Sequence, residues 1–165
     1  MVPTAIGKSG ATPDLANSGM PYWPRVEGAI AYAAVLGSLT IPGRPEHVRE
    51  ARAFVAKALG ELDPRLEAAV LLTSELVTNA VTHSNSRCDG GSVTLTITES
   101  SGGVRIEVAD QGSDLSAPVV RSDVYASDGH GLFLVQTLAD QWGYLREQSG
   151  TTVWLWLTGS KPTAQ

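Results

Sequence analysis

The sequence predicts an α/β protein, a two-layer α+β sandwich in which helices pack on one face of a mixed, mostly antiparallel sheet. Two observations predict this class. Residues 45–59 and 64–83 carry apolar side chains at helical spacing, and residues 92–109 and 142–157 alternate apolar and polar side chains around short glycine-containing turns. Such helices and strands bury their apolar faces against one another, and a length of 165 residues suits one domain.

Three segments are expected along the chain. Residues 1–28 are rich in Gly, Pro, Ser and Thr and poor in large aliphatic side chains, which predicts a flexible N-terminal tail. The folded domain is expected over 29–159, followed by a polar C-terminal tail at 160–165. The first element of the domain is an expected edge strand that ends at 38–41, before a Pro-Gly pair.

Two helices are predicted next. The first opens near Pro45, stops at Gly60 and repeats apolar residues at intervals of three and four. These residues are Val48, Ala51, Phe54, Val55, Ala58 and Leu59. The second is expected to begin with Asp63 as N-cap and Pro64 in the first turn, and to run to about His83.

Two hairpins are predicted in the second half of the chain. Strands at 92–98 and 104–109 flank the turn Gly102-Gly103, and strands at 142–147 and 151–157 flank a turn at Gly150. Between the hairpins lies a loop from Ser113 to about Gly129, before a short apolar helix that begins at Gly131. Loops of this length in compact domains are usually functional or disordered.

The composition restricts the classes of partner. A net charge of −5 and a pI near 5.1 argue against nucleic acid or an anionic membrane surface as the main partner. Cys88 is the only cysteine, which excludes an internal disulfide and suits a reducing compartment. The most apolar early stretch, 29–36, is too short to cross a bilayer, and no secretory signal is evident, so a cytoplasmic location is expected. The wide spacing of His47, His83 and His130 predicts no zinc site.

The second helix carries the first candidate site. At 100° per residue, Glu75, Asn79, Thr82 and His83 fall on one narrow stripe. The opposite side is apolar apart from one threonine, with Leu66, Ala69, Val70, Thr73, Val77, Ala80 and Val81. A carboxylate and a carboxamide one turn apart can hold a hard cation such as Mg²⁺ and orient a hydroxyl. An ordinary solvated helix face would show the same spacing.

Two further motifs follow. In Asp110-Gln111-Gly112, a carboxylate at a strand end can accept a hydrogen bond from an amine such as that of adenine, and the glycine lets the backbone approach a flat base. A simple turn has the same sequence. In Gly129-His130-Gly131-Leu132, glycines before an apolar helix expose N–H groups to a phosphate, although a plain helix cap also fits. Neither the Walker pattern nor the dinucleotide fingerprint is present.

The order and spacing of these three motifs resemble the Bergerat-fold ATPases, the GHKL class. Within that class the chain is similar to the single-domain anti-sigma-factor serine/threonine kinases of actinobacteria, the RsbW and SpoIIAB type. The segments that carry this similarity are 74–83, 131–143 and 150–154, and the resemblance extends over roughly residues 39–157. It implies the histidine-kinase-like ATPase fold, with ATP and Mg²⁺ as ligands.

The resemblance also implies roles for individual residues. Asn79 would bind the Mg²⁺ that bridges the ATP phosphates, and Glu75 would be the base for the attacking hydroxyl. Asp110 would recognise the N6 amine of adenine, with Thr152 sharing a water beside it. His83 would approach the phosphates or the ribose, or else face water as an ordinary residue at a helix end.

The nucleotide lid would complete the site. The implied contacts there are Gly112, Gly129, His130, Gly131 and Leu132. His130 stands where many relatives have arginine, which makes a cationic phosphate contact weaker or pH-dependent. Over residues 113–128 the lid has one cationic residue, Arg121, against three acidic ones and no lysine.

Three functions are compatible with these features. The resemblance implies an ATP-dependent protein serine/threonine kinase that phosphorylates a small antagonist protein, binds a sigma factor or that antagonist, and forms a homodimer as many relatives do. A non-catalytic, nucleotide-gated interaction module fits the lid composition, although it has no need of Glu75 as a base. The third hypothesis is a structural α/β domain in which the motifs are coincidental.

Overall fold

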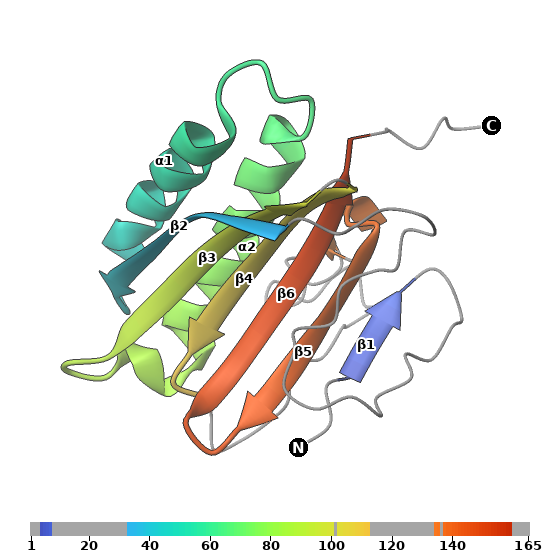
Figure 1. The fold of residues 1–165 in the computed structure, drawn as a ribbon. Coiled ribbons are helices and arrows are strands. Elements are labelled where there is room, and N and C mark those ends of the chain that lie inside the picture. Colours follow the sequence, from blue (N-terminus) through green and yellow to red (C-terminus); the bar gives the residue numbers. More distant parts are fainter. Residues whose placement is uncertain (1–3, 8–32, 101, 113–133, 136, 160–165) are drawn as a thin grey trace.

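The computed structural model describes residues 4–7, 33–100, 102–112, 134–135 and 137–159. Its strands are β1 (Thr4–Gly7), β2 (Ala33–Pro42), β3 (Ser92–Ser100), β4 (Gly103–Asp110), β5 (Gln141–Glu147) and β6 (Gly150–Thr158). They form one sheet in the order β1-β5-β6-β4-β3-β2, and both α-helices lie on the same face of it (Figure 1). The predicted two-layer sandwich is confirmed.

The pairing of the strands differs from expectation in two respects. Each pair in the described sheet is antiparallel, so the mixed character that the sequence suggested is not seen there. β1 was not predicted, because residues 1–28 were assigned to a flexible tail; Thr4–Gly7 instead pair with Gln141–Tyr144 of β5. The other residues of that tail lie outside the described part of the chain. The two predicted hairpins, β3–β4 and β5–β6, are confirmed.

The edge strand β2 is longer than predicted. It begins at Ala33 and pairs only with β3, which confirms its place at the edge of the sheet. A register shift between Val35 and Gly37 interrupts this pairing. Bulges of this kind twist an edge strand and discourage its pairing with another chain.

The first helix follows the predicted boundaries. A 3-10 turn, η1 (Pro45–His47), leads into α1 (Val48–Leu59). Gly60 ends the helix with a φ of +84°, a conformation that glycine adopts without strain.

The second helix starts later than predicted. α2 spans Leu66–His83, so Asp63 is not its N-cap. The Asp63 carboxylate instead accepts a hydrogen bond from the backbone N–H of Arg65 at 2.8 Å. This local bond forms a turn that competes with the helix for the same residues, and the helix therefore begins beyond it.

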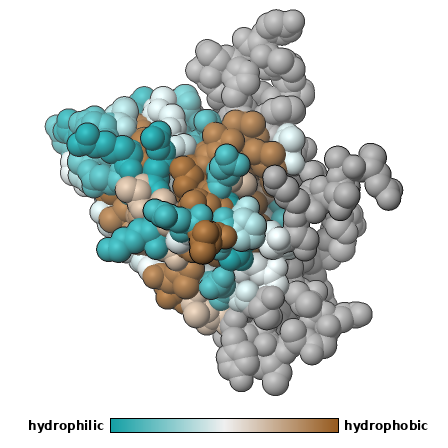
Figure 2. Space-filling view, turned by 90° about the horizontal axis from the view of Figure 1, so that it is seen from above, coloured by the Kyte–Doolittle hydropathy of each residue, from teal (hydrophilic) through white to brown (hydrophobic). Residues whose placement is uncertain are grey.

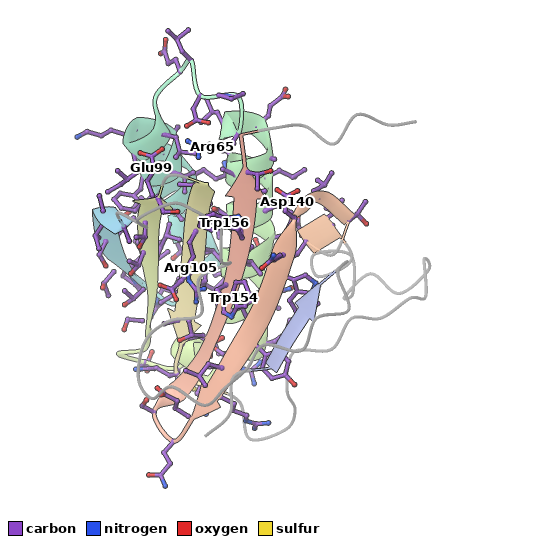
Figure 3. The ribbon with its side chains drawn as sticks, turned by 45° about the vertical axis from the view of Figure 1, so that its right-hand side comes forward. Arg65, Glu99, Arg105, Asp140, Trp154 and Trp156 are labelled. Atoms are coloured by element: carbon purple, nitrogen blue, oxygen red, sulfur yellow. The ribbon has the colours of Figure 1, made fainter. Side chains whose placement is uncertain are left out.

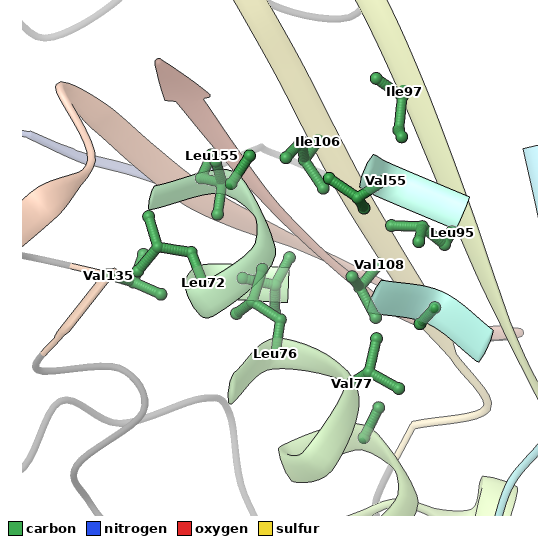
Figure 4. Close-up of a cluster of buried hydrophobic side chains, with 14 of the residues drawn as sticks. Val55, Leu72, Leu76, Val77, Leu95, Ile97, Ile106, Val108, Val135 and Leu155 are labelled. Atoms are coloured by element: carbon green, nitrogen blue, oxygen red, sulfur yellow. The ribbon is translucent and has the colours of Figure 1, made fainter. Parts of the chain in front are cut away.

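The core lies between α1, α2 and the facing side of the sheet. Figure 4 shows Leu72, Leu76 and Val77 of α2 packed against strand residues that include Val108 and Leu155. Alternation along the strands supplies the sheet side of this core, as the sequence predicted. Its strand members are Ile41, Val93, Leu95, Ile97, Val104, Ile106, Val108, Trp142, Val153, Leu155 and Leu157.

The opposite face of the sheet carries a second buried group. Arg105 of β4 lies opposite Trp156 of β6, and its guanidinium stacks 4.4 Å from the ring centroid of Trp154 (Figure 3). It also donates to Glu107 at 2.8 Å. Arg105 is 4% exposed and both tryptophans are 3% exposed, so these side chains are buried although they point away from the helices. Burial lowers the pKa of Arg105, and the Glu107 carboxylate opposes that change.

Arg65 joins the helical layer to the sheet. Its guanidinium makes a two-point contact with Asp63, with Nε to Oδ1 at 2.8 Å and Nη2 to Oδ2 at 2.6 Å. The same Nη2 donates to Glu99 of β3 at 2.9 Å (Figure 3). Only 13% of the Arg65 side chain and 9% of the Asp63 side chain are exposed, so solvent screens this contact weakly.

Replacing Asp63 by asparagine is expected to lower the free energy of unfolding by about 2 kcal/mol at neutral pH, because it removes a charge-assisted two-point contact. The hydrogen bond from Arg65 holds the pKa of Asp63 below its ordinary value. The stabilisation is therefore present above the pKa of an unfolded aspartate and is lost as pH falls through the folded pKa. Urea denaturation near neutral pH and in acid, with exposed Glu61→Gln as control, checks this. A difference from wild type that persists undiminished in acid would contradict it.

The outer surface is mixed in character. In a view from above, hydrophilic side chains gather at the left, the side of α1 in Figure 1, and hydrophobic ones in the middle (Figure 2). Within the described ranges, neither helix combines the length and the apolar character that crossing a membrane requires.

Candidate nucleotide site

The predicted polar stripe of α2 lies at the border of the core. Glu75 and Asn79 are half-buried, and Thr82 and His83 are exposed. The opposite side of the helix is buried, as predicted, at Ala69, Thr73, Val77, Ala80 and Val81, whereas Leu66 and Val70 are only half-buried. The Glu75 and Asn79 side chains thus keep polar oxygens one turn apart on a helix whose back is held in the core.

The Asp110 carboxylate is fixed where β4 ends. Its Oδ1 accepts the N–H of Gly112 at 2.6 Å, and the carboxylate also accepts the backbone N–H of Thr151. Gly112 has a φ of +75°, which favours glycine. A side chain at Gly150 would collide with the carbonyl oxygen of Asp110, so this turn also requires glycine. The result is a half-buried carboxylate in a rigid setting.

Burial raises the pKa of Asp110, and its two backbone hydrogen bonds oppose the rise. A raised folded pKa means that ionisation costs stability as pH rises through that value. An ionised carboxylate accepts hydrogen bonds more strongly than a protonated one. If Asp110 accepts a hydrogen bond from a ligand amine, that bond reaches its full strength only above the raised pKa of Asp110.

The affinity for an adenine nucleotide is therefore expected to fall on acidification at a higher pH than an ordinary aspartate would cause. Calorimetric titration with ATP across a pH series checks this. A variant with Asp110→Asn keeps a carbonyl acceptor and should lose this step, apart from the titration of the phosphates. If ATP affinity falls on acidification in the same way in both proteins, the pH dependence does not come from Asp110.

The strand register corrects the neighbour that was assigned to this carboxylate. The resemblance implied Thr152 beside Asp110, but Asp110 pairs with Thr151, and Thr152 pairs with Ala109. Successive residues of a strand face opposite sides of the sheet. Thr151 thus shares the helix-facing side with Asp110 and is 6% exposed, whereas Thr152 belongs to the other face.

A short helical segment packs beside α2. Leu134 and Val135 are helical, and Val135 is fully buried near Leu72 and Leu76 (Figure 4). Asp140, just beyond this segment, accepts the N–H and the hydroxyl of Thr158 at 2.7 and 3.0 Å. The predicted helix is thereby confirmed in part. The residues expected to open it, Gly129, His130, Gly131 and Leu132, lie outside the described residues, as does the predicted lid at 113–128.

The end of α2 is joined to the turn at Asp110, Gln111 and Gly112, called the Asp110 turn below. The polar segment between α2 and β3 contains a 3-10 turn, η2 (Asn85–Arg87). The N–H of Asn85 donates to the carbonyl of Gly112 at 2.6 Å. Asn79 and Asp110, distant in sequence, thus belong to one connected unit. The sequence alone did not predict this hydrogen bond, because polar residues are common after any helix.

The oxygen donors of α2 suit magnesium better than zinc. Among the described residues, no group of three or more His, Cys, Asp or Glu side chains could hold a metal ion on its own. The amide oxygen of Asn79 is a ligand of the kind that Mg²⁺ takes when substrate phosphates complete its shell. The residues present therefore fit a magnesium ion that arrives with a phosphate ligand.

Comparison with known families agrees with this geometry. A family model described as the histidine kinase-like ATPase domain matches residues 41–157, most of the chain. No curated protein matches the sequence. The matched range contains α1, α2, the Asp110 turn and both hairpins, and it indicates an ATP-binding module of the GHKL class. The chain belongs to the histidine kinase-like ATPase domain family.

Proposed function

We propose that the protein is an ATP-dependent protein serine/threonine kinase of the anti-sigma-factor type, which acts in the cytoplasm on a small antagonist protein. The observation that carries the proposal is the pairing of half-buried Glu75 and Asn79 on α2, tied through η2 to the Asp110 turn. Nucleotide binding alone has no need of a carboxylate one turn from the metal ligand. A sigma factor as second partner and a homodimer belong to the same proposal.

The adenine ring would lie against the Asp110 turn. The carboxylate accepts a hydrogen bond from the N6 amine of the base, and Gly112, whose positive φ favours glycine, has no side chain to keep the base from the backbone. Thr151, on the same face as Asp110, supports this proposal better than Thr152 as the residue that shares a water with the carboxylate.

The phosphates would lie along α2. Asn79 would supply an oxygen ligand to Mg²⁺, and the ion would supply positive charge to the phosphates. His83, exposed one turn beyond Asn79, would reach the phosphates or the ribose. Gly129, His130, Gly131 and Leu132 would offer backbone N–H groups and a cap to the nucleotide.

Glu75 would accept the proton in the transfer step. The substrate hydroxyl oxygen forms a bond to the γ-phosphorus, and the bond from that phosphorus to the β–γ bridging oxygen breaks. The hydroxyl proton passes to the Glu75 carboxylate, and ADP leaves with the bonding electron pair. Positioning and charge stabilisation supply most of the acceleration in such a reaction.

A second function has one specific observation in its favour. Residues 113–128 contain Arg121 as their only cationic side chain, against Asp114, Asp123 and Asp128. A lid of this composition gives little positive charge to stabilise a transferring phosphoryl group. The alternative is therefore a nucleotide-gated interaction module that binds ATP and a protein partner without transfer.

A transfer assay separates the two functions. The whole chain is incubated with γ-labelled ATP and Mg²⁺ in a lysate of the organism that encodes it, beside an Asn79→Ala variant. A small protein labelled on serine or threonine only by the wild type supports the kinase. ATP binding that needs Asn79, with no labelled protein at any concentration, favours the interaction module.

A further inference from the structure

Ser86 is the most enclosed residue of the segment between α2 and β3. It is fully buried in η2, and its Oγ accepts the backbone N–H of Gln111 at 2.9 Å. Gln111 is the residue directly after Asp110 and directly before Gly112. A side-chain hydroxyl from one segment thus holds the middle of the turn that carries the candidate base-binding carboxylate.

Two hydrogen bonds through Ser84 tie the backbone of Ser86 to the last turn of α2. The Ser84 hydroxyl donates to the carbonyl of Ala80 at 2.6 Å and accepts the N–H of Ser86 at 3.0 Å. Ala80 is the neighbour of Asn79. Buried hydrogen bonds hold their partners in fixed geometry. The Asp110 turn therefore keeps a fixed position relative to the turn of α2 that carries Asn79.

The backbone of η2 has little room to shift. A Cβ atom at Gly43 or at Gly91 would collide with the carbonyl oxygen of Ser86, so these two glycines let the chain close around that carbonyl. The N–H of Gly43 also donates to the carbonyl of Gly91 at 3.0 Å. The Ser86 hydroxyl is therefore presented to Gln111 from a rigid support.

We infer that Ser86 is a positioning residue for base recognition: it sets the Asp110 carboxylate at a fixed distance from the metal-binding end of the site. This inference rests on the proposed nucleotide site. Without the hydroxyl, the Gln111 N–H loses this acceptor, and among the described residues the Asn85 to Gly112 bond is what still ties η2 to the turn. The carboxylate then meets the N6 amine in poorer geometry, while the phosphate contacts on α2 are untouched.

Two nucleotides isolate this effect. ATP carries the N6 amine, and purine riboside triphosphate has a hydrogen in its place and keeps the same ribose and phosphates. The ratio of their dissociation constants measures the contact with Asp110. In Ser86→Ala, affinity for ATP should fall about tenfold, the equivalent of one neutral hydrogen bond, while affinity for purine riboside triphosphate stays within about twofold. The ratio of the two dissociation constants should therefore move toward one by about tenfold.

A matched control and a milder variant accompany the test. Thr73→Val removes an equally buried hydroxyl from α2, far from the Asp110 turn in sequence, and should leave the ratio unchanged. Ser86→Cys keeps a weak acceptor on a slightly larger side chain, so it should give an intermediate ratio, and it replaces the alanine variant if that variant does not fold. Hydrogen exchange at the Gln111 amide without ligand should accelerate in both Ser86 variants.

The outcomes are distinguishable. Equal losses for both nucleotides, or a ratio that Ser86→Ala leaves at the wild-type value, overturn the positioning role and leave the proposed site intact. A wild type that binds both nucleotides equally overturns base recognition by Asp110, and the role of Ser86 with it. A ratio that moves toward one, with faster Gln111 exchange, supports the inference.

Discussion

Replacing Glu75 by glutamine is expected to lower phosphoryl transfer by about 100- to 10,000-fold, the usual contribution of a positioned general base. Glutamine keeps the shape of the side chain but cannot take the proton from the attacking hydroxyl. Glu75 is half-buried at the border of the core, so this isosteric change leaves the packing of α2 in place. ATP affinity should change little, since the metal and base contacts lie elsewhere. Single-turnover transfer with the identified substrate, beside calorimetric ATP binding, measures both quantities.

The control for this variant comes from the same helix. Glu67 lies in the first turn of α2 and is exposed, so Glu67→Gln makes the same chemical change away from Glu75 and Asn79. It should transfer phosphate at the wild-type rate. A Glu75→Gln protein that transfers as fast as the control would remove Glu75 from the reaction.

Replacing Asn79 by alanine is expected to abolish the part of ATP affinity that depends on Mg²⁺. Loss of an outer-shell partner already costs roughly 10- to 100-fold in metal affinity, and loss of a direct ligand should cost at least as much. The side chain is half-buried and alanine favours helices, so α2 should keep its stability. Titrations with ATP in Mg²⁺ and in EDTA separate the metal-dependent part from the rest.

Thr78→Ala serves as the matched control, because Thr78 is exposed on the neighbouring position of the same helix. The Thr78→Ala variant should retain the full difference in ATP affinity between Mg²⁺ and EDTA. If Asn79→Ala also retains that difference, magnesium is bound by other groups and the assignment of Asn79 is wrong.

The sequence predicted what local patterns encode. Apolar spacing at three and four located α1 and most of α2, and alternation located β3 to β6, because each pattern reports a face that the chain itself must bury. β1 escaped prediction since Thr4–Gly7 form a strand only through pairing with β5, more than 130 residues away in sequence by the pairing of Gly7 with Gln141. The start of α2 was misplaced because Asp63 bonds to Arg65 in a local turn.

The candidate site shows the same division. The helical period placed Glu75 and Asn79 on one stripe of α2, and the strand pattern placed Asp110 and Gly112 at the end of β4, as the structure has them. The neighbour of Asp110 could not be predicted, because a one-residue difference in strand register exchanges Thr151 for Thr152 and reverses the face. The contact of Ser86 could not be predicted either, because its partner Gln111 is 25 residues away and a serine after a helix is ordinary.

Calorimetric titration of the whole chain with ATP and with GTP in Mg²⁺ tests the nucleotide site most directly. Adenine presents a donor amine at its sixth position, whereas guanine presents an acceptor oxygen that would face the acceptor carboxylate of Asp110. We expect one ATP site and a GTP affinity that is weaker by roughly 100-fold or more, because a buried polar group of the site is then left unpaired. Equal affinity for the two nucleotides, or binding of neither, would contradict it.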